Sequence, residues 1–184
     1  MPYPPRPLIR GGTYFITSRC INFEPYLQTS ETKDIVLACI AKAQTRYRFE
    51  LSAFGIMDEQ LKLTIRTLND TDTVSRIMQH IKANITRMVN RRMCRTGTIW
   101  NERFMSTVIS CVKETADFIR RSLMLTASGE RDKGRGLSFS RYDSLGAYLS
   151  GNKSGIAVTI HEAFLMLGDS LEKRREWICG AGFV

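Results

Sequence analysis

Residues 60–66 read Gln-Leu-Lys-Leu-Thr-Ile-Arg, and their side chains alternate between polar and apolar along the whole segment. A period of two is typical of a β-strand that buries one face. Gln60 and Lys62 then lie together on the face opposite the apolar side chains. This strand is expected at 60–67, and another is expected at 49–57, directly before a turn at 57–59. The two strands therefore predict a β-hairpin within an antiparallel sheet.

The flanking segments predict the elements that complete such a sheet. Further strands are expected at 13–19 and 106–112, because both segments are rich in β-branched or aromatic residues. Apolar stripes with helical spacing predict three helices. The first begins near Ser30, the second ends near Arg92, and the third occupies 114–127. The order β-α-β-β-α-β-α predicts an α+β fold. We expect a ferredoxin-like, split βαβ antiparallel sheet of four to five strands with helices on one face.

The chain of 184 residues is expected to divide at about residue 128. Residues 1–128 would form the main domain, and residues 129–184 a C-terminal extension whose short helices pack on it. Helices are expected near 160–167 and 170–179. The charged, Gly-rich segment 130–136 predicts a flexible loop between the two parts.

The charge of the chain is strongly positive and unevenly distributed. The 27 Lys and Arg residues exceed the 18 Asp and Glu residues, which gives a net charge of +9. Between Arg76 and Arg103 there are seven basic residues and one acidic residue. Because clustered cations neutralise adjacent phosphates together, this segment predicts contact with nucleic acid. Trp100 would either stack on an unpaired base or anchor the core.

The remaining composition indicates a cytoplasmic protein without a membrane span. No apolar run approaches the roughly 20 residues that a transmembrane helix needs, and the Pro-rich start lacks the apolar core of a signal peptide. The five cysteines have no CxxC spacing and are expected to be buried free thiols. The two histidines, His80 and His161, are far apart in the sequence and predict helix-surface or core residues rather than a metal site.

Several segments, in order, resemble the IS200-like tyrosine transposases, particularly the branch associated with repetitive extragenic palindromes (REP). The first is R-G-G-T-Y-F-I-T-S-R at 10–19, and the second is R-F-E-L-S-A-F-G-I-M-D-E-Q-L-K-L-T-I at 48–65. The third runs from S-R-I-M-Q-H-I-K at 75–82 to N-R-R-M-C-R-T-G-T-I-W-N-E-R-F-M-S-T at 90–107. The last is Y-D-S-L-G-A-Y-L-S-G at 142–151. The resemblance covers most of residues 6–180.

The resemblance implies a protein that recognises a DNA hairpin and cleaves an adjacent single strand. In active members a His-hydrophobic-His motif binds Mg²⁺ or Mn²⁺, which polarises the scissile phosphate. A tyrosine on the helix after the fourth strand attacks and forms a 5′-phosphotyrosine. Family members are often dimers, so a homodimer is also expected.

The chain departs from this pattern at all three catalytic positions. Gln60 and Lys62 stand where the metal-binding histidines are expected, and Ser122 stands where the nucleophilic tyrosine is expected. The resemblance therefore predicts a protein that binds hairpin or single-stranded DNA without an intact catalytic site, metal or cofactor. Lys62 would be either a phosphate contact or a surface lysine. The residues expected to contact DNA are Arg10, Arg19, Lys62, Arg87, Arg91, Arg92, Arg95, Trp100 and Arg103.

Two alternative functions stay open at this point. The first is an active metal-dependent transposase whose rearranged site uses Gln60, Glu59 and either Tyr142 or Tyr148. The second is an RNA-binding protein of the RRM type, which the split βαβ order permits. The characteristic aromatic motif of that class is missing from the central strands, which disfavours it.

Overall fold

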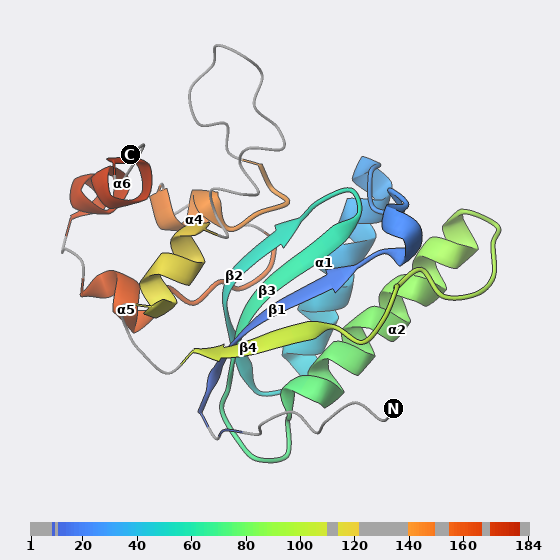
Figure 1. Cartoon of the computed structure of the whole chain (residues 1–184), viewed down its shortest axis with the longest axis horizontal. Helices are drawn as coiled ribbons and strands as arrows, with labels where there is room; N and C mark the ends of the chain where they lie inside the picture. Colours follow the sequence, from blue (N-terminus) through green and yellow to red (C-terminus); the bar gives the residue numbers. More distant parts are fainter. Residues whose placement is uncertain are drawn as a thin grey trace, which may run out of the picture.

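A four-stranded antiparallel sheet forms the centre of the protein (Figure 1). The computed structural model describes residues 9, 11–109, 114–121, 140–149, 155–166 and 170–180. The strand order is β2-β3-β1-β4. The strands are β1 (Thr13–Arg19), β2 (Phe49–Ile56), β3 (Gln60–Thr67) and β4 (Met105–Ile109). The predicted α+β class is confirmed, and β1 and β3 have the predicted bounds.

Two long helices cover the first face of the sheet (Figure 1). They are α1 (Ser30–Arg46) and α2 (Val74–Arg92). Each begins where a threonine side chain accepts a hydrogen bond from a backbone N–H of the first turn: Thr29 caps α1, and Thr73 caps α2. Leu61, Leu63 and Ile65 are at most 1% exposed beneath the helices, which explains the alternation of the sequence.

The opposite face of the sheet also carries helices, so the expectation that helices occupy one face holds only for α1 and α2. A helical segment at 114–121 places Phe118 against Phe15 of β1, with 5.3 Å between the ring centroids. The short helix α5 (Glu162–Leu165) begins at His161, whose Nε2 lies 3.3 Å from the hydroxyl of Thr13. Thr64 of β3 is fully buried as a result, although it is polar.

The C-terminal extension also closes the free edge of β2. The N–H of Ile56 donates to the carbonyl of Tyr142 at 2.9 Å, and the N–H of Ser144 donates to the carbonyl of Phe54 at 3.0 Å. Helix α4 (Leu145–Leu149) follows and packs against α6 (Leu171–Gly180). This pairing satisfies backbone groups that an edge strand otherwise exposes.

Several predictions lie outside the described residues. They are the loop at 130–136, the domain boundary at 128, the ends of the strand at 106–112 and of the helix at 114–127, and the side chains of Arg10, Cys111, Ser122 and Cys179. Within the described part of the chain, no helix has the length and hydropathy that a membrane span requires. Cys20 and Cys39 are buried free thiols as predicted, whereas Cys94 is exposed, so that prediction is wrong for Cys94.

Candidate functional site

Gln60 and Lys62 lie at one end of the second sheet face, surrounded by residues of the neighbouring strands. Antiparallel pairing places Arg19 opposite Gln60 and Thr17 opposite Lys62. On the other side of β3, Gly55 lies opposite Lys62. Because paired residues on adjacent strands point to the same face, Arg19 lies beside both Gln60 and Lys62.

The amide of Gln60 is held by local contacts. Its Nε2 lies 2.9 Å from Sδ of Met57 and 3.4 Å from a carboxylate oxygen of Glu59. The Glu59 backbone carbonyl accepts a hydrogen bond from the N–H of Cys20 at 2.7 Å. Burial, together with the Glu59 carboxylate, raises the pKa of the Cys20 thiol to about 11. The thiol is therefore protonated at neutral pH and is a poor nucleophile.

Lys62 is only 9% exposed, so its interpretation as a surface lysine is wrong. Burial lowers the pKa of its ammonium group, and the neighbouring charge of Arg19 lowers it further, while Glu59 acts in the opposite direction. Among the described residues no carboxylate forms a salt bridge with Lys62. The folded protein therefore holds a desolvated cation at the position that the resemblance assigns to a metal ligand.

Replacement of Lys62 by methionine is expected to stabilise the free protein at pH 7. The pKa of Lys62 is lower in the folded than in the unfolded chain, so the unfolded chain binds more protons between the two pKa values. Wild-type stability then rises with pH across that window and reaches its full value above about pH 10.5. The advantage of Lys62→Met should disappear over the same window.

Thermal unfolding from pH 6 to pH 11 measures this effect, since 1 kcal/mol shifts the Tm of a chain of this size by about 2–4 °C. Lys33→Met is the matched control, because Lys33 forms a 3.0 Å salt bridge with Asp58 and should lose stability instead. An unchanged or lower Tm for Lys62→Met at pH 7 would contradict the assignment of Lys62 as a buried cation whose desolvation exceeds the favourable effect of Glu59.

Arginines occur at the end of β1, in the last turn of α2 and in the loop that follows α2. The loop after α2 runs along the end of β1, where the N–H of Asn101 donates to the carbonyl of Arg19 at 3.0 Å. Arg95 in this loop lies over the ring of Tyr26, with 4.3 Å between its guanidinium carbon and the ring centroid. We call these cations the sheet-end surface, which consists of Arg19, Arg91, Arg92, Arg95 and Arg103. All are exposed except Arg95, which is partly buried.

Trp100 belongs to the core, so the prediction that it stacks on a base is wrong. The residue is 5% exposed, and its Nε1 donates to the carbonyl of Lys82 at 3.2 Å. The Lys82 ammonium lies over the same ring, 5.3 Å from its centroid. One face and the polar edge of the indole are therefore already used within the protein.

Arg87 does not lie with the sheet-end surface. It lines a separate groove between α1 and α2 together with Lys42, Arg46 and Arg76. Lys42 and Arg46 were not among the expected DNA contacts, because they belong to a different helix and reach the other cations only through helix packing. Their spacing of four residues on a predicted helix was the one available signal, since it places both on the same face.

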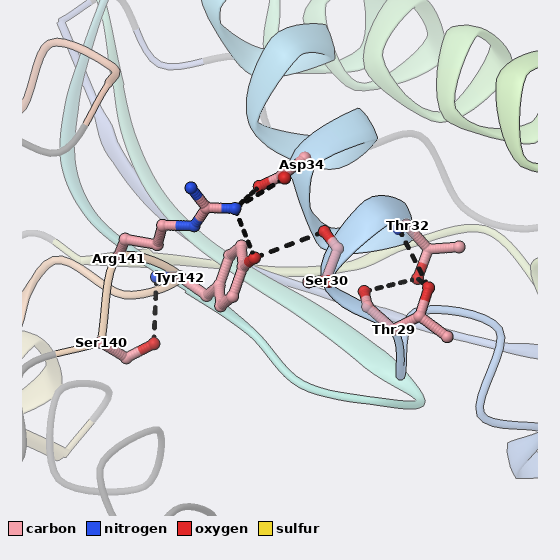
Figure 2. Close-up of polar contacts among 7 residues, drawn as sticks. All are labelled: Thr29, Ser30, Thr32, Asp34, Ser140, Arg141 and Tyr142. Atoms are coloured by element: carbon pink, nitrogen blue, oxygen red, sulfur yellow. Dashed lines mark hydrogen bonds and ion pairs between the residues drawn. The ribbon is translucent and has the colours of Figure 1, made fainter.

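Neither tyrosine of the alternative active site has a free hydroxyl on the Lys62 face. Tyr148 is 1% exposed and donates to the carbonyl of Ser52 at 2.7 Å. Burial also raises the pKa of the Tyr148 hydroxyl above its ordinary value. Figure 2 shows that the hydroxyl of Tyr142 lies at the start of α1, within 2.8 Å of Arg141 and 3.3 Å of the carbonyl of Ser30. Because α1 covers the first face, the sheet separates this hydroxyl from Lys62.

The described residues offer few ligands for a metal ion at this site. They include no group of three or more His, Cys, Asp or Glu side chains that is arranged to hold a metal. At the position itself, Gln60 supplies one neutral amide oxygen and Lys62 supplies a positive charge. His161 is buried at the far end of the strands, beside Thr13, and His80 is on α2.

Comparisons with known proteins match this architecture. The family model described as "Transposase IS200 like" matches residues 13–121. A solved structure of a REP-associated tyrosine transposase bound to a REP hairpin is 19% identical, with a TM-score of 0.67, and the match covers 88% of this chain and 94% of that chain. A putative transposase from Deinococcus radiodurans R1 is 15% identical, with a TM-score of 0.47, over 67% of this chain and 97% of that chain.

No curated protein gives a significant match. The likeness to the REP-associated transposase covers more of the chain than the region that the family model matches. The family model alone spans the sheet, both long helices and the helical segment at 114–121. The chain belongs to the IS200-like transposase family.

Proposed function

We propose that this protein binds hairpin or single-stranded DNA and does not cleave it. The observation that carries the proposal is the pair Gln60 and Lys62, which places a neutral amide and a buried cation side by side on β3. Arg19 of the sheet-end surface lies beside this pair. Together these residues can hold phosphates, but they lack the donor set of a metal-dependent nuclease.

The charge of Lys62 suits a phosphate and opposes a metal ion. A divalent cation prefers several carboxylate, carbonyl or imidazole ligands, and an ammonium group repels it. A phosphate oxygen beside Lys62 would instead compensate a cation that has no salt bridge among the described residues. Such a contact can fix the position of a strand, but it supplies neither a nucleophile nor the Lewis acid of the active family members.

DNA as the partner is supported by the family and by the surface charge. The REP-associated transposase of known structure was solved with a REP hairpin, which makes a hairpin the first DNA to test here. The RRM-type alternative is disfavoured because that class binds RNA on an open sheet face. Here the corresponding face is covered at one end, where Phe15 packs on Phe118. A homodimer stays a prediction.

Replacing Arg91, Arg92 and Arg103 with alanine is expected to weaken DNA binding about tenfold or more at 150 mM salt, and to reduce the salt slope by about 2–3. Arg95 is left in place because its contact with Tyr26 makes it partly structural. Fluorescence anisotropy with a hairpin that carries a single-stranded flank, measured between 50 and 300 mM salt, gives both quantities.

Lys173→Ala, which removes an exposed charge from α6, should leave affinity and salt slope unchanged. The same samples, incubated with Mg²⁺ or Mn²⁺ and run on a denaturing gel, should contain only intact DNA. A covalent protein–DNA product would support the active-transposase alternative and overturn the proposal. Wild-type protein that binds none of the hairpin, single-stranded and duplex probes would overturn it as well.

A further inference from the structure

A basic groove lies between α1 and α2, on the side of the molecule away from Lys62. Its volume is about 390 Å³. Lys42 and Arg46 line it from α1, while Arg76 and Arg87 line it from α2. All four side chains are exposed, and no carboxylate lines the groove. Four cations thus share one open groove without an acidic partner in its lining.

The packing of the two helices causes the cations to converge. Lys42 and Arg46 are four residues apart, and Arg76 and Arg87 lie on one stripe of α2 together with His80. Burial lowers the pKa of His80, and the charges of Arg46, Lys42 and Arg87 lower it further. Cations from both helices therefore lie close enough to His80 to act on the same imidazole.

The hydrogen bonds that the groove arginines donate go to neutral acceptors, although the charge of Arg76 also acts on the nearby Asp72 carboxylate. Arg76 donates to the carbonyl of Thr71 at 2.8 Å, and Arg87 donates to Oδ1 of Asn84 at 3.3 Å. Within the part of the chain that the structure describes, none of the groove cations forms a salt bridge. Like charges repel at this spacing, so an anion bound in the groove would relieve the repulsion.

We propose that the groove binds the phosphodiester backbone of a duplex DNA stem, as a second DNA contact separate from the sheet-end surface. This inference rests on the proposed function, because it takes DNA as the partner. From Arg76 to Arg87 the groove follows α2 for about 16 Å. One strand of a duplex presents a phosphate about every 3.4 Å along the helix axis, so this length spans several phosphates.

The lining favours the backbone of a duplex over unpaired bases. Tyr47 is the one aromatic residue among the lining residues apart from His80, and the two rings already pack edge to face, with 5.4 Å between their centroids. Arg46 lies over the Tyr47 ring as well. Without a free ring for base stacking, the groove can hold phosphates but gives no platform for single-stranded DNA.

The direction of α2 connects the groove to the sheet-end surface. Arg91 follows Arg87 by one helical turn, a rise of about 6 Å, and continues the same stripe. A stem that lies in the groove would therefore lead toward Arg91 and Arg92 of the sheet-end surface. A hairpin with a single-stranded flank fits this arrangement, because its stem and its flank would meet the two surfaces in sequence.

The variant Lys42→Gln, Arg46→Gln, Arg87→Gln tests the groove. We expect its affinity for a hairpin with a flank to fall about tenfold or more, with the salt slope reduced by about 2–3. Its affinity for an unstructured single strand of equal length should change less than about twofold, since the sheet-end surface is intact. An equal loss on both probes, or no loss on the hairpin, would overturn the inference.

The sheet-end variant separates this outcome from the proposed function. If the groove variant binds hairpin normally while the Arg91, Arg92 and Arg103 variant does not, only the groove inference fails. If wild-type protein binds neither probe, the proposed function fails first. Circular dichroism and the Tm of the groove variant show whether it is folded. The three positions are exposed and their like charges repel, so the Tm should not fall.

The pKa of His80 gives a local measurement of binding in the groove, which a general loss of DNA binding would not reproduce. Bound phosphates would add negative charge beside His80 and raise its pKa, which an NMR titration of the free and bound protein measures. His161, which is buried beside Thr13 on the other side of the sheet, is the internal reference. An unchanged pKa of His80 in the hairpin complex, or an equal rise with single-stranded DNA, would overturn a duplex site in the groove.

Discussion

Replacement of Trp100 by alanine is expected to lower the free energy of unfolding by about 3–5 kcal/mol. The side chain is 5% exposed and belongs to the hydrophobic core between the first face of the sheet and helices α1 and α2. Its loss leaves a cavity and removes the hydrogen bond from Nε1 to the carbonyl of Lys82. Because domains of this size are commonly stable by about 5–15 kcal/mol, the variant should unfold at a clearly lower denaturant concentration.

Urea unfolding of Trp100→Ala, Trp100→Phe and Phe23→Ala distinguishes the core role from base stacking. Trp100→Phe keeps a large ring and should lose only about 1–2 kcal/mol. Phe23 is 65% exposed near the same surface, so Phe23→Ala should change stability by less than about 1 kcal/mol. If Trp100→Ala left stability intact but weakened DNA binding by about 1–3 kcal/mol, the indole would be a stacking platform after all.

The sheet could be predicted from the sequence because its signals are local. Alternation in β3 and the β-branched residues of β1 gave the bounds of both strands, and α1 begins at Ser30 and α2 ends at Arg92 as expected. The pairing of Tyr142 and Ser144 with the edge of β2 had no such signal. It depends on backbone hydrogen bonds, which almost any side chains can accompany.

The candidate site was predicted in part. The period of two placed Gln60 and Lys62 on one face, and the family resemblance gave that position its meaning. The burial of Lys62 could not be predicted, because an alternating strand indicates one covered face, and the second cover comes from segments later in the chain. Likewise, the sequence shows only that arginines are frequent between Arg76 and Arg103. The position of Arg87 in the groove depends on how α1 and α2 pack, which the sequence does not show.

The double variant Gln60→His, Lys62→His is expected to bind Ni²⁺ or Zn²⁺ with a Kd of about 10 µM, which corresponds to about 7 kcal/mol. Residues two apart on one strand face are about 6.6 Å apart, and imidazole suits both ions at about 2.0–2.1 Å. The change also removes the cation that repels a metal. Isothermal titration calorimetry at pH 7.5 measures the gain over wild-type protein, for which no binding at this site is expected.

The control Gln60→Asn, Lys62→Met removes the same cation without adding a ligand, so it separates relief of repulsion from coordination. It should bind no more metal than the wild-type protein, and each single histidine variant should bind at least about tenfold more weakly than the pair. The pair should still leave DNA uncut, because the family resemblance places Ser122 where the nucleophilic tyrosine is expected. Equal metal affinity in the control, or none in the double variant, would mean that the two β3 positions do not converge on one ion. The same-face arrangement of Gln60 and Lys62 would then not be a former metal site.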